Sequence, residues 1–123
     1  MPSAIITGGS QGIGKATALL FARKGYDLVL SARSPEVLEA TVAEVGKIGI
    51  KVLAVKCDVS QEAEVNALIS KALENFGSID VLINNAGICM TGPIENTSLS
   101  DWHRVMDVNV WGYIHTIHAL LPH

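Results

Sequence analysis

The fold of this chain is decided by the stretch TGGSQGIG at residues 7–14. It directly follows a short apolar run, and a stretch of helical periodicity begins inside it. Gly8 permits a tight turn, Gly12 lets an anion approach the backbone, and Gly14 lets a helix pack closely on the strand. The N–H groups and positive dipole of a helix N-terminus attract phosphate. The stretch therefore predicts a strand, a diphosphate-binding turn and a helix, with a turn used only for packing as the alternative.

Short apolar runs alternate with longer helical stretches along the whole chain, which is typical of a parallel sheet with crossover helices. The expected strands are Ala4–Thr7, Leu28–Ser31, Val52–Val55 and Val81–Asn84. The expected helices run over Gly12–Lys24, from Ser34 and Pro35 to near Gly49, over Gln61–Phe76 and from Ser98 to Leu121. The strands show no polar alternation, so we expect helices on both faces of the sheet.

Apolar residues at helical spacing predict which side of each helix faces the core. The expected inward residues are Ile13, Ala16, Leu20 and Phe21 in the first helix, Leu38, Val42 and Val45 in the second, and Val65, Leu68, Ile69 and Ala72 in the third. The second half of the last helix is apolar nearly all round, so a second partner should cover it. We expect that partner to be another subunit, which makes the protein a homo-oligomer.

Composition limits the class of protein. The 123 residues fit one domain, and 49% hydrophobic with 17% charged residues can form a core. A net charge of -3 argues against nucleic acid as a partner. The sequence has neither an apolar run of membrane-spanning length nor a basic leader, so we expect no membrane contact and a cytoplasmic location. Cys57 and Cys89 are expected to be free thiols.

Four motifs occur in order along the chain. They are T-G-x-x-x-G-x-G at residues 7–14, Asp58 after the third strand, N-N-A-G at residues 84–87 after the fourth, and Asn109 in the last helix. Together they resemble the short-chain dehydrogenase/reductase family, whose members are NAD(P)-dependent oxidoreductases. The resemblance implies a Rossmann-type, doubly wound α/β fold. It covers the first four strands and their helices and stops before the fifth strand, so residues 1–123 are an incomplete NAD(P)-binding domain.

The resemblance assigns roles to particular residues. Asp58 would bind the adenine amino group, and Asn109 would support a catalytic lysine through water. The implied cofactor-binding set is Gly8, Ser10, Gln11, Gly12, Ile13, Gly14, Arg33, Asp58, Val59, Asn85, Ala86 and Gly87. Structural alternatives remain at this point: Asp58 as a helix cap before Ser60, residues 84–87 as an Asn-rich turn, and Asn109 as a buried amide that needs partners.

The end of the second strand predicts which dinucleotide binds. NAD-binding members use an acid there for the ribose 2′-hydroxyl, whereas this chain has Ala32 followed by Arg33. Arg33 could pair with the 2′-phosphate of NADP(H), which we therefore favour over NAD(H). Ser10, Ser31 and Ser34 would be lesser phosphate or ribose contacts. Gln11 departs from the basic residue of many NADP-preferring members.

The family's catalytic tyrosine is followed by lysine four residues later, but Leu30 follows Tyr26 and Ile117 follows Tyr113 at that spacing. Ser100 precedes Tyr113 by a suitable distance in sequence. Both residues lie in the same predicted helix as Asn109, however, and that helix matches an earlier region of the family than the catalytic one. We expect hydride transfer between NADP(H) and a carbonyl or alcohol substrate, with this chain as the cofactor half and inactive alone.

Two other functions compete with this one. A noncatalytic dinucleotide-binding or redox-sensing protein would also use the glycine turn. A phosphoacceptor receiver domain would use Asp58, but acids for Mg²⁺ are absent after the first strand. No metal site is expected, because His115 and His118 have no acidic or cysteine ligand near them in sequence.

Overall fold

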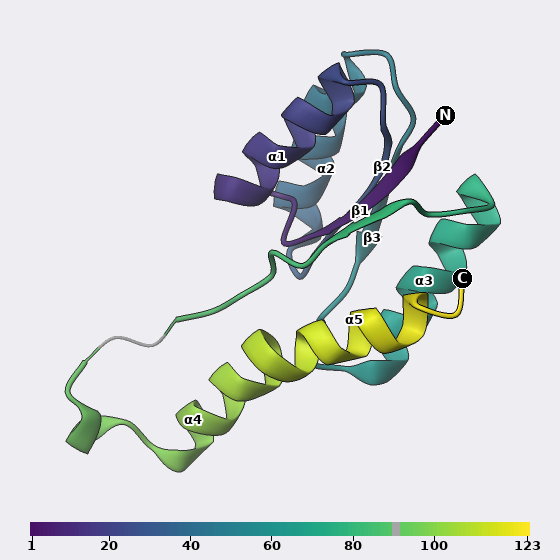
Figure 1. Ribbon diagram of the computed structural model, residues 1–123. Helices are drawn as coiled ribbons and strands as arrows, with labels where there is room; N and C mark the ends of the chain where they lie inside the picture. Colours follow the sequence, from purple (N-terminus) through teal and green to yellow (C-terminus); the bar gives the residue numbers. More distant parts are fainter. Residues whose placement is uncertain (90–91) are drawn as a thin grey trace.

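The computed structural model describes residues 1–89 and 92–123 as one α/β layer structure (Figure 1). Its centre is a four-stranded parallel sheet in the order β3-β2-β1-β4. The strands are β1 Ser3–Thr7, β2 Asp27–Ala32, β3 Val52–Lys56 and β4 Val81–Ile83. The doubly wound fold and the position of all four predicted strands are confirmed, with ends that differ by one residue at most.

Helices cover both faces of the sheet, as Figure 1 shows. They are α1 Gly12–Arg23, α2 Pro35–Gly46, α3 Glu62–Phe76, α4 Leu99–Met106 and α5 Gly112–Leu120, with a short 3-10 turn at Ile94–Asn96. The pair α1 and α2 lies on one face, while α3 and α5 lie on the other. Within the described residues, no helix has the length and apolar character needed to cross a bilayer.

The middle of each strand is apolar because successive side chains enter two different cores. Ile5 and Val29 face α3, whereas Ile6, Leu28 and Leu30 face α1 and α2. All five are fully buried. Burial of each such side chain stabilises the fold by about 1.5–3 kcal/mol. The predicted inward residues of α2 and α3 also lie in these cores or pack against them.

The predicted inward face of α1 is wrong for three of its four residues, since Phe21 packs against the core as predicted but Ile13, Ala16 and Leu20 are exposed. Ile13 is 79% and Leu20 is 50% exposed, whereas Gly14, Ala18 and Ala22 are buried. Small residues occupy the inner side because α1 lies too close to the sheet for long ones. A Cβ atom on Gly14 would overlap the Gly8 carbonyl oxygen. The spacing of apolar residues therefore predicted the wrong side of α1, because the size of the side chains, and not their hydrophobicity, decides which side can face the sheet.

The helices differ from the prediction in two main respects, the end of α2 and the interior of the last helix. The helix α2 ends at Gly46, three residues before Gly49, which adopts a φ of 106° in the following turn. The predicted single helix from Ser98 to Leu121 is one continuous rod with a π-helical segment, η2 (Asp107–Trp111), between α4 and α5. Ser98 caps the rod, as predicted, by accepting a hydrogen bond from the Asp101 N–H.

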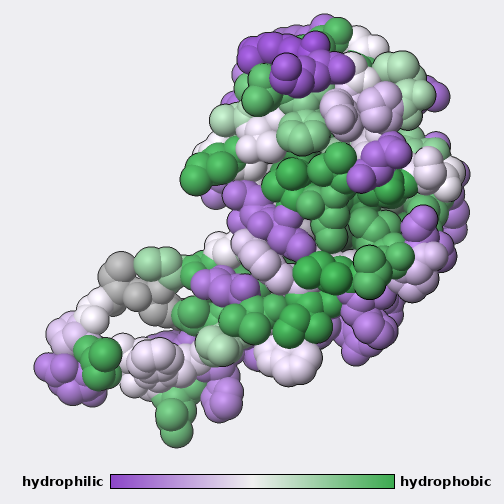
Figure 2. Space-filling model, in the orientation of Figure 1, coloured by the Kyte–Doolittle hydropathy of each residue, from purple (hydrophilic) through white to green (hydrophobic). Residues whose placement is uncertain are grey.

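The rod that contains α4, η2 and α5 buries only one side. Val108 and Thr116 face inward, whereas Trp111, Ile114 and Ile117 are between 43% and 51% exposed. Figure 2 shows hydrophobic surface along this rod. The prediction that one sheet cannot cover all of its apolar residues is confirmed, because a helix presents side chains in every direction.

The start of α5 packs tightly on the loop after β3. A Cβ atom on Gly112 would lie 2.6 Å from Val59 Cγ2 and 3.1 Å from Val59 Cβ. Valine has little rotamer freedom with which to move away. Sequence periodicity gave no signal for this contact.

We predict that Gly112→Ala lowers the free energy of unfolding by about 1–2 kcal/mol, because overpacking outweighs the gain in helix propensity. Gly46→Ala is the matched control, since a Cβ atom there meets nothing within 4 Å. The control should gain about 0.5–1 kcal/mol. Urea unfolding followed by circular dichroism measures both, and equal stability of the two variants would contradict the packing argument.

Candidate active site

A pocket of about 300 Å³ lies where the strands reach their carboxyl ends. Its lining residues are Gly8, Ser10, Gln11, Ser31, Ala32, Arg33, Ser34, Cys57, Asp58, Val59, Asn85, Ala86, Gly87, Ile88 and Val108. The position follows from the strand order. The chain leaves β1 toward the α1 face and leaves β4 toward the opposite face, so a crevice opens between the two connections. Figure 2 shows the molecule hollowed between the α1–α2 layer and the arm formed by α4.

The glycine turn has the geometry that the sequence predicted. Gly8 has a φ of 64°, and a Cβ atom there would lie 2.9 Å from Ala86 Cα. Gly12 has a φ of 59° and open space where its Cβ atom would be. Only glycine adopts these backbone angles at low cost. The turn therefore leaves room for a ligand beside the N-terminus of α1.

Thr7 joins the glycine turn to the end of β4. Its Oγ1 atom accepts hydrogen bonds from the N–H groups of Asn85 and Ala86, both at 3.1 Å, and donates to the Ile83 carbonyl at 3.4 Å. The Asn85 side chain returns a bond from Nδ2 to the Gly8 carbonyl at 3.0 Å. The N-N-A-G segment is thus more than a local Asn-rich turn, because it bonds to residues far away in the sequence.

Asp58 lies in the pocket wall at the end of β3. Its Oδ1 atom accepts from the Ser60 N–H at 3.0 Å and from the Ser60 hydroxyl at 2.7 Å. The helix α3 has Gln61 as its N-cap residue, so Asp58 forms a turn before the helix and is not its cap. This arrangement fixes the carboxylate beside the pocket.

Cys57 also lines the pocket and was not predicted to do so. Burial, together with the nearby carboxylates of Glu64 and Asp58, raises the pKa of its thiol to about 12. The thiol is therefore protonated at neutral pH and is a poor nucleophile. Cys57 and Cys89 are both free, as predicted.

Ser31 supplies an unpaired hydroxyl in the pocket wall. The residue is 1% exposed, and its Oγ atom has no hydrogen-bond partner among residues 1–89 and 92–123. A buried hydroxyl without a partner costs about 1–3 kcal/mol. The Ser31 carbonyl, in contrast, accepts from the Gly9 N–H at 3.1 Å. A polar ligand in the pocket is the type of partner that this hydroxyl lacks.

The carboxyl end of β2 places Arg33 at the pocket. Ala32 and Arg33 both line it, together with Ser31 and Ser34, and none of the four is acidic. Ser34 also bonds through Oγ to the Glu36 carboxylate at 3.3 Å. A cation, neighbouring hydroxyls and the N-terminus of α1 therefore surround one pocket, which fits a ligand that carries phosphate groups.

Asn109 lies in η2, and its side chain is fully used by the backbone of Ile88. The Ile88 N–H donates to Asn109 Oδ1 at 2.8 Å, and Asn109 Nδ2 donates to the Ile88 carbonyl at 2.7 Å. The expectation that this amide needs partners is confirmed. The pair holds the segment after β4 against the rod.

The pocket brings together most, but not all, of the predicted site residues. Gly12, Ile13, Gly14 and Asn109 are absent from its described lining, since the two glycines shape the turn and Ile13 is exposed. Sequence reasoning missed Cys57, Ile88 and Val108. Each is the sequence neighbour of a predicted segment or residue, and that adjacency was the available signal.

The histidines of α5 lie next to α3 and the loop after β3. The His115 ring nitrogen Nδ1 lies 2.8 Å from the Val59 carbonyl oxygen. His115 and His118 line a shallow depression between α3 and α5. In the described ranges, no three His, Cys, Asp or Glu side chains gather as metal ligands.

Comparison with known proteins identifies the family. The family model described as short chain dehydrogenase matches residues 2–123. The chain belongs to the short-chain dehydrogenase family. This membership confirms the resemblance based on the four motifs and argues against the receiver domain.

Three relatives place the chain within the short-chain dehydrogenase family. An uncharacterized oxidoreductase of Staphylococcus saprophyticus is 42% identical over 97% of this chain and 48% of its own length. The alcohol dehydrogenase of Thermococcus sibiricus, solved with 5-hydroxy-NADP, is 39% identical with a TM-score of 0.95 over 99% of this chain and 52% of that one. The L-sorbose reductase of Gluconobacter frateurii, solved with NADPH and L-sorbose, is 33% identical with a TM-score of 0.94 over 98% and 46%. The chain thus spans about half the length of these relatives.

We predict that Thr7→Val lowers the free energy of unfolding by about 2–4 kcal/mol, because it leaves the N–H groups of Asn85 and Ala86 without their acceptor. Thr7→Ser keeps the hydroxyl and should lose only about 1 kcal/mol from the missing methyl group. Chemical denaturation measures the free energy of unfolding of both variants. Equal losses in both variants would mean that the methyl group, and not the hydroxyl, is what matters.

Proposed function

We propose that this chain is the cofactor-binding half of an NADP(H)-dependent oxidoreductase, which transfers a hydride between the cofactor and a carbonyl or alcohol substrate. The observation that carries the proposal is one pocket lined by both the glycine turn and Arg33. A dinucleotide is long enough to use both, because its diphosphate and its 2′-phosphate lie at different points along the molecule.

The diphosphate would bind at the N-terminus of α1. The first N–H groups of a helix have no acceptors within the helix, and its dipole places about half a positive charge there. Gly12 leaves open space at this point, and Ser10 and Gln11 line the pocket beside it. The anion would thus be held mainly by backbone groups, which is consistent with a chain of net charge -3.

Arg33 is the basis for preferring NADP(H). Its guanidinium can form two parallel hydrogen bonds to a phosphate, and none of the neighbouring pocket-lining residues Ser31, Ala32 and Ser34 carries a carboxylate for a ribose hydroxyl. Two of the structural relatives above were solved with NADP-type cofactors, which supports this preference. Asp58 and Val59 would hold the adenine, with Asp58 Oδ1 already fixed by Ser60.

When bound, a nicotinamide ring supplies or accepts the hydride. The residues of this chain bind and orient the dinucleotide, and Asn85, Ala86 and Gly87 line the same pocket. Asn109 Oδ1 and Nδ2 each bond to the backbone of Ile88, which fixes the residue, and in this proposal Asn109 would support a catalytic lysine through water. The proposal assigns the acid–base tyrosine and lysine to residues outside these 123.

One observation favours a second candidate, a noncatalytic dinucleotide-binding or redox-sensing protein. Neither Tyr26 nor Tyr113 is followed by lysine four residues later. Both candidates require dinucleotide binding, and turnover separates them. In the protein encoded by the whole natural reading frame, oxidation of NADPH with a panel of aldehydes and ketones supports the oxidoreductase, while tight binding without turnover supports the sensor.

We predict that Arg33→Ala weakens NADPH binding about 10- to 100-fold and leaves NADH binding within about twofold. A charge-assisted hydrogen bond contributes about 1.5–3 kcal/mol, and 1.4 kcal/mol corresponds to a tenfold change. Isothermal titration calorimetry measures both affinities. Arg23→Ala is the matched control, because Arg23 is an exposed arginine at the opposite end of α1.

Two outcomes would overturn parts of the proposal. If wild-type protein binds neither dinucleotide, the assignment of the pocket fails. If Arg33→Ala weakens NADPH and NADH equally, Arg33 does not recognise the 2′-phosphate and the preference for NADP(H) fails.

We further propose that a second copy of the protein covers the exposed side of the rod. Ile114 and Ile117 lie one turn apart on α5 and are 43% and 47% exposed. We expect wild-type protein to sediment as an oligomer and the double variant Ile114→Glu, Ile117→Glu to sediment as a monomer, because charges in an apolar interface are costly. Ile94→Glu, at a more exposed isoleucine outside the rod, is the control. A monomeric wild type over the whole concentration range would contradict the proposal.

A further inference from the structure

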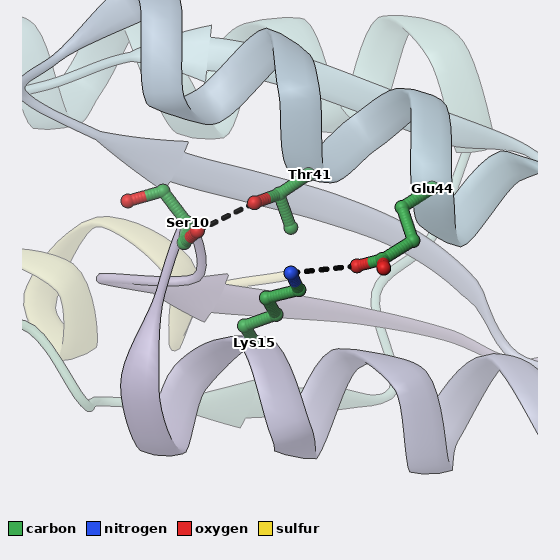
Figure 3. Close-up of polar contacts among 4 residues, drawn as sticks. All are labelled: Ser10, Lys15, Thr41 and Glu44. Atoms are coloured by element: carbon green, nitrogen blue, oxygen red, sulfur yellow. Dashed lines mark hydrogen bonds and ion pairs between the residues drawn. The ribbon is translucent and has the colours of Figure 1, made fainter.

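A buried hydrogen bond connects α2 to the backbone of the glycine turn. Thr41 lies in the middle of α2 and is 3% exposed, and its Oγ1 atom donates to the Ser10 carbonyl (Figure 3). The two residues are 31 positions apart in sequence. Ser10 itself is 7% exposed, and its side chain points away from Thr41. The helix thus bonds to the main chain of Ser10 and leaves its side chain beside the pocket.

This bond determines how one peptide group of the turn is oriented. The peptide bond between Ser10 and Gln11 is trans, so its C=O and N–H groups point in opposite directions. Because the Ser10 carbonyl is directed toward Thr41, the Gln11 N–H is directed away from α2. Gln11 lines the pocket, and no described residue accepts a hydrogen bond from its N–H.

The opposite orientation would oppose anion binding. A rotated Ser10–Gln11 peptide would turn its carbonyl dipole away from α2 and withdraw an N–H donor from the pocket. Glycines at positions 8, 9 and 12 surround this peptide and give the turn wide conformational freedom. An external anchor is therefore needed to hold one orientation.

We propose that Thr41 is a positioning residue for the diphosphate: its hydroxyl fixes the Ser10–Gln11 peptide so that the Gln11 N–H faces the bound anion. This inference rests on the proposed dinucleotide function of the pocket. Thr41 does not line the pocket and acts only through the main chain of the turn.

The neighbouring ion pair does not perform this task. Lys15 Nζ lies 2.7 Å from Glu44 Oε2 and also connects α1 to α2 (Figure 3). Its hydrogen bond and charge lower the pKa of the Glu44 carboxyl. Both side chains are well exposed, at 39% and 49%, so water screens the pair. Lys15 reaches the turn only through its main-chain N–H, which donates to the Gln11 carbonyl at 3.3 Å and not to the Ser10 carbonyl.

The test compares Thr41→Val with Thr41→Ser in titrations with NADPH and with adenosine 2′-monophosphate, which lacks the diphosphate. We expect Thr41→Val to weaken NADPH binding about tenfold, the equivalent of one net hydrogen bond, and to leave binding of the monophosphate within about twofold. Thr41→Ser retains the donor and should restore NADPH affinity to within about threefold of wild type.

Thr17→Val is the matched control. Thr17 Oγ1 also donates to a main-chain carbonyl, that of Ile13 at 2.7 Å, but within α1 and away from the Ser10–Gln11 peptide. The same chemical change there should alter NADPH affinity less than twofold. If Thr41→Val does not fold, Thr41→Ala carries the same comparison, with folding checked by thermal melting.

The possible results test the role of Thr41 and the proposed function separately. A wild type that binds no NADPH overturns the function on which the inference rests. Normal NADPH binding by Thr41→Val overturns the inference and leaves the function standing. Equal loss of NADPH and the monophosphate also overturns it, since a general change in the pocket would then explain both losses.

Discussion

The contact between the turn after β1 and the segment after β4 is the constraint on which the site depends. Gly8 lies against the backbone of Ala86 so closely that a Cβ atom would be 2.9 Å from Ala86 Cα. Thr7 fills the interior of this contact and accepts from two N–H groups of the opposite segment. Both segments leave adjacent parallel strands at the same edge of the sheet, and Gly8, Asn85 and Ala86 at their contact all line the pocket.

Small residues allow the layers to approach closely enough for this contact to form. Gly14, Ala18 and Ala22 bring α1 against the sheet, and Gly112 brings α5 against Val59. Interiors are packed at nearly crystalline density, so one added methyl group at such points displaces backbone or a stiff side chain. The π-helical segment η2 also joins two parts of the fold, but by hydrogen bonds. It places Asn109 where the side-chain amide pairs with both the N–H and the C=O group of Ile88.

The pocket is suited to an anion although the chain is acidic overall. In the proposed function the attraction would come from backbone N–H groups, a helix dipole and one arginine, while the thiol of Cys57 stays neutral because burial and two nearby carboxylates raise its pKa. A backbone N–H group can donate a hydrogen bond to an anion only when its peptide group is turned toward the pocket. Thr41 on Ser10 and Asn85 on Gly8 hold the turn from outside, and in the proposed function they would keep its N–H groups in the orientation that binds the anion.

The sequence by itself determined the order of strands and helices, the glycine turn, the stripe of α3 and the cap at Ser98, because each depends on neighbours within a few residues. It also predicted Asp58, Arg33 and residues 85–87 as neighbours in space, since parallel strands bring their carboxyl ends to one edge. Only the tertiary structure decided which side of α1 is buried, that Asn109 pairs with Ile88 and that Thr41 holds Ser10. These features join residues 21 to 31 positions apart, or depend on how closely two layers approach, and local periodicity carries no information about either.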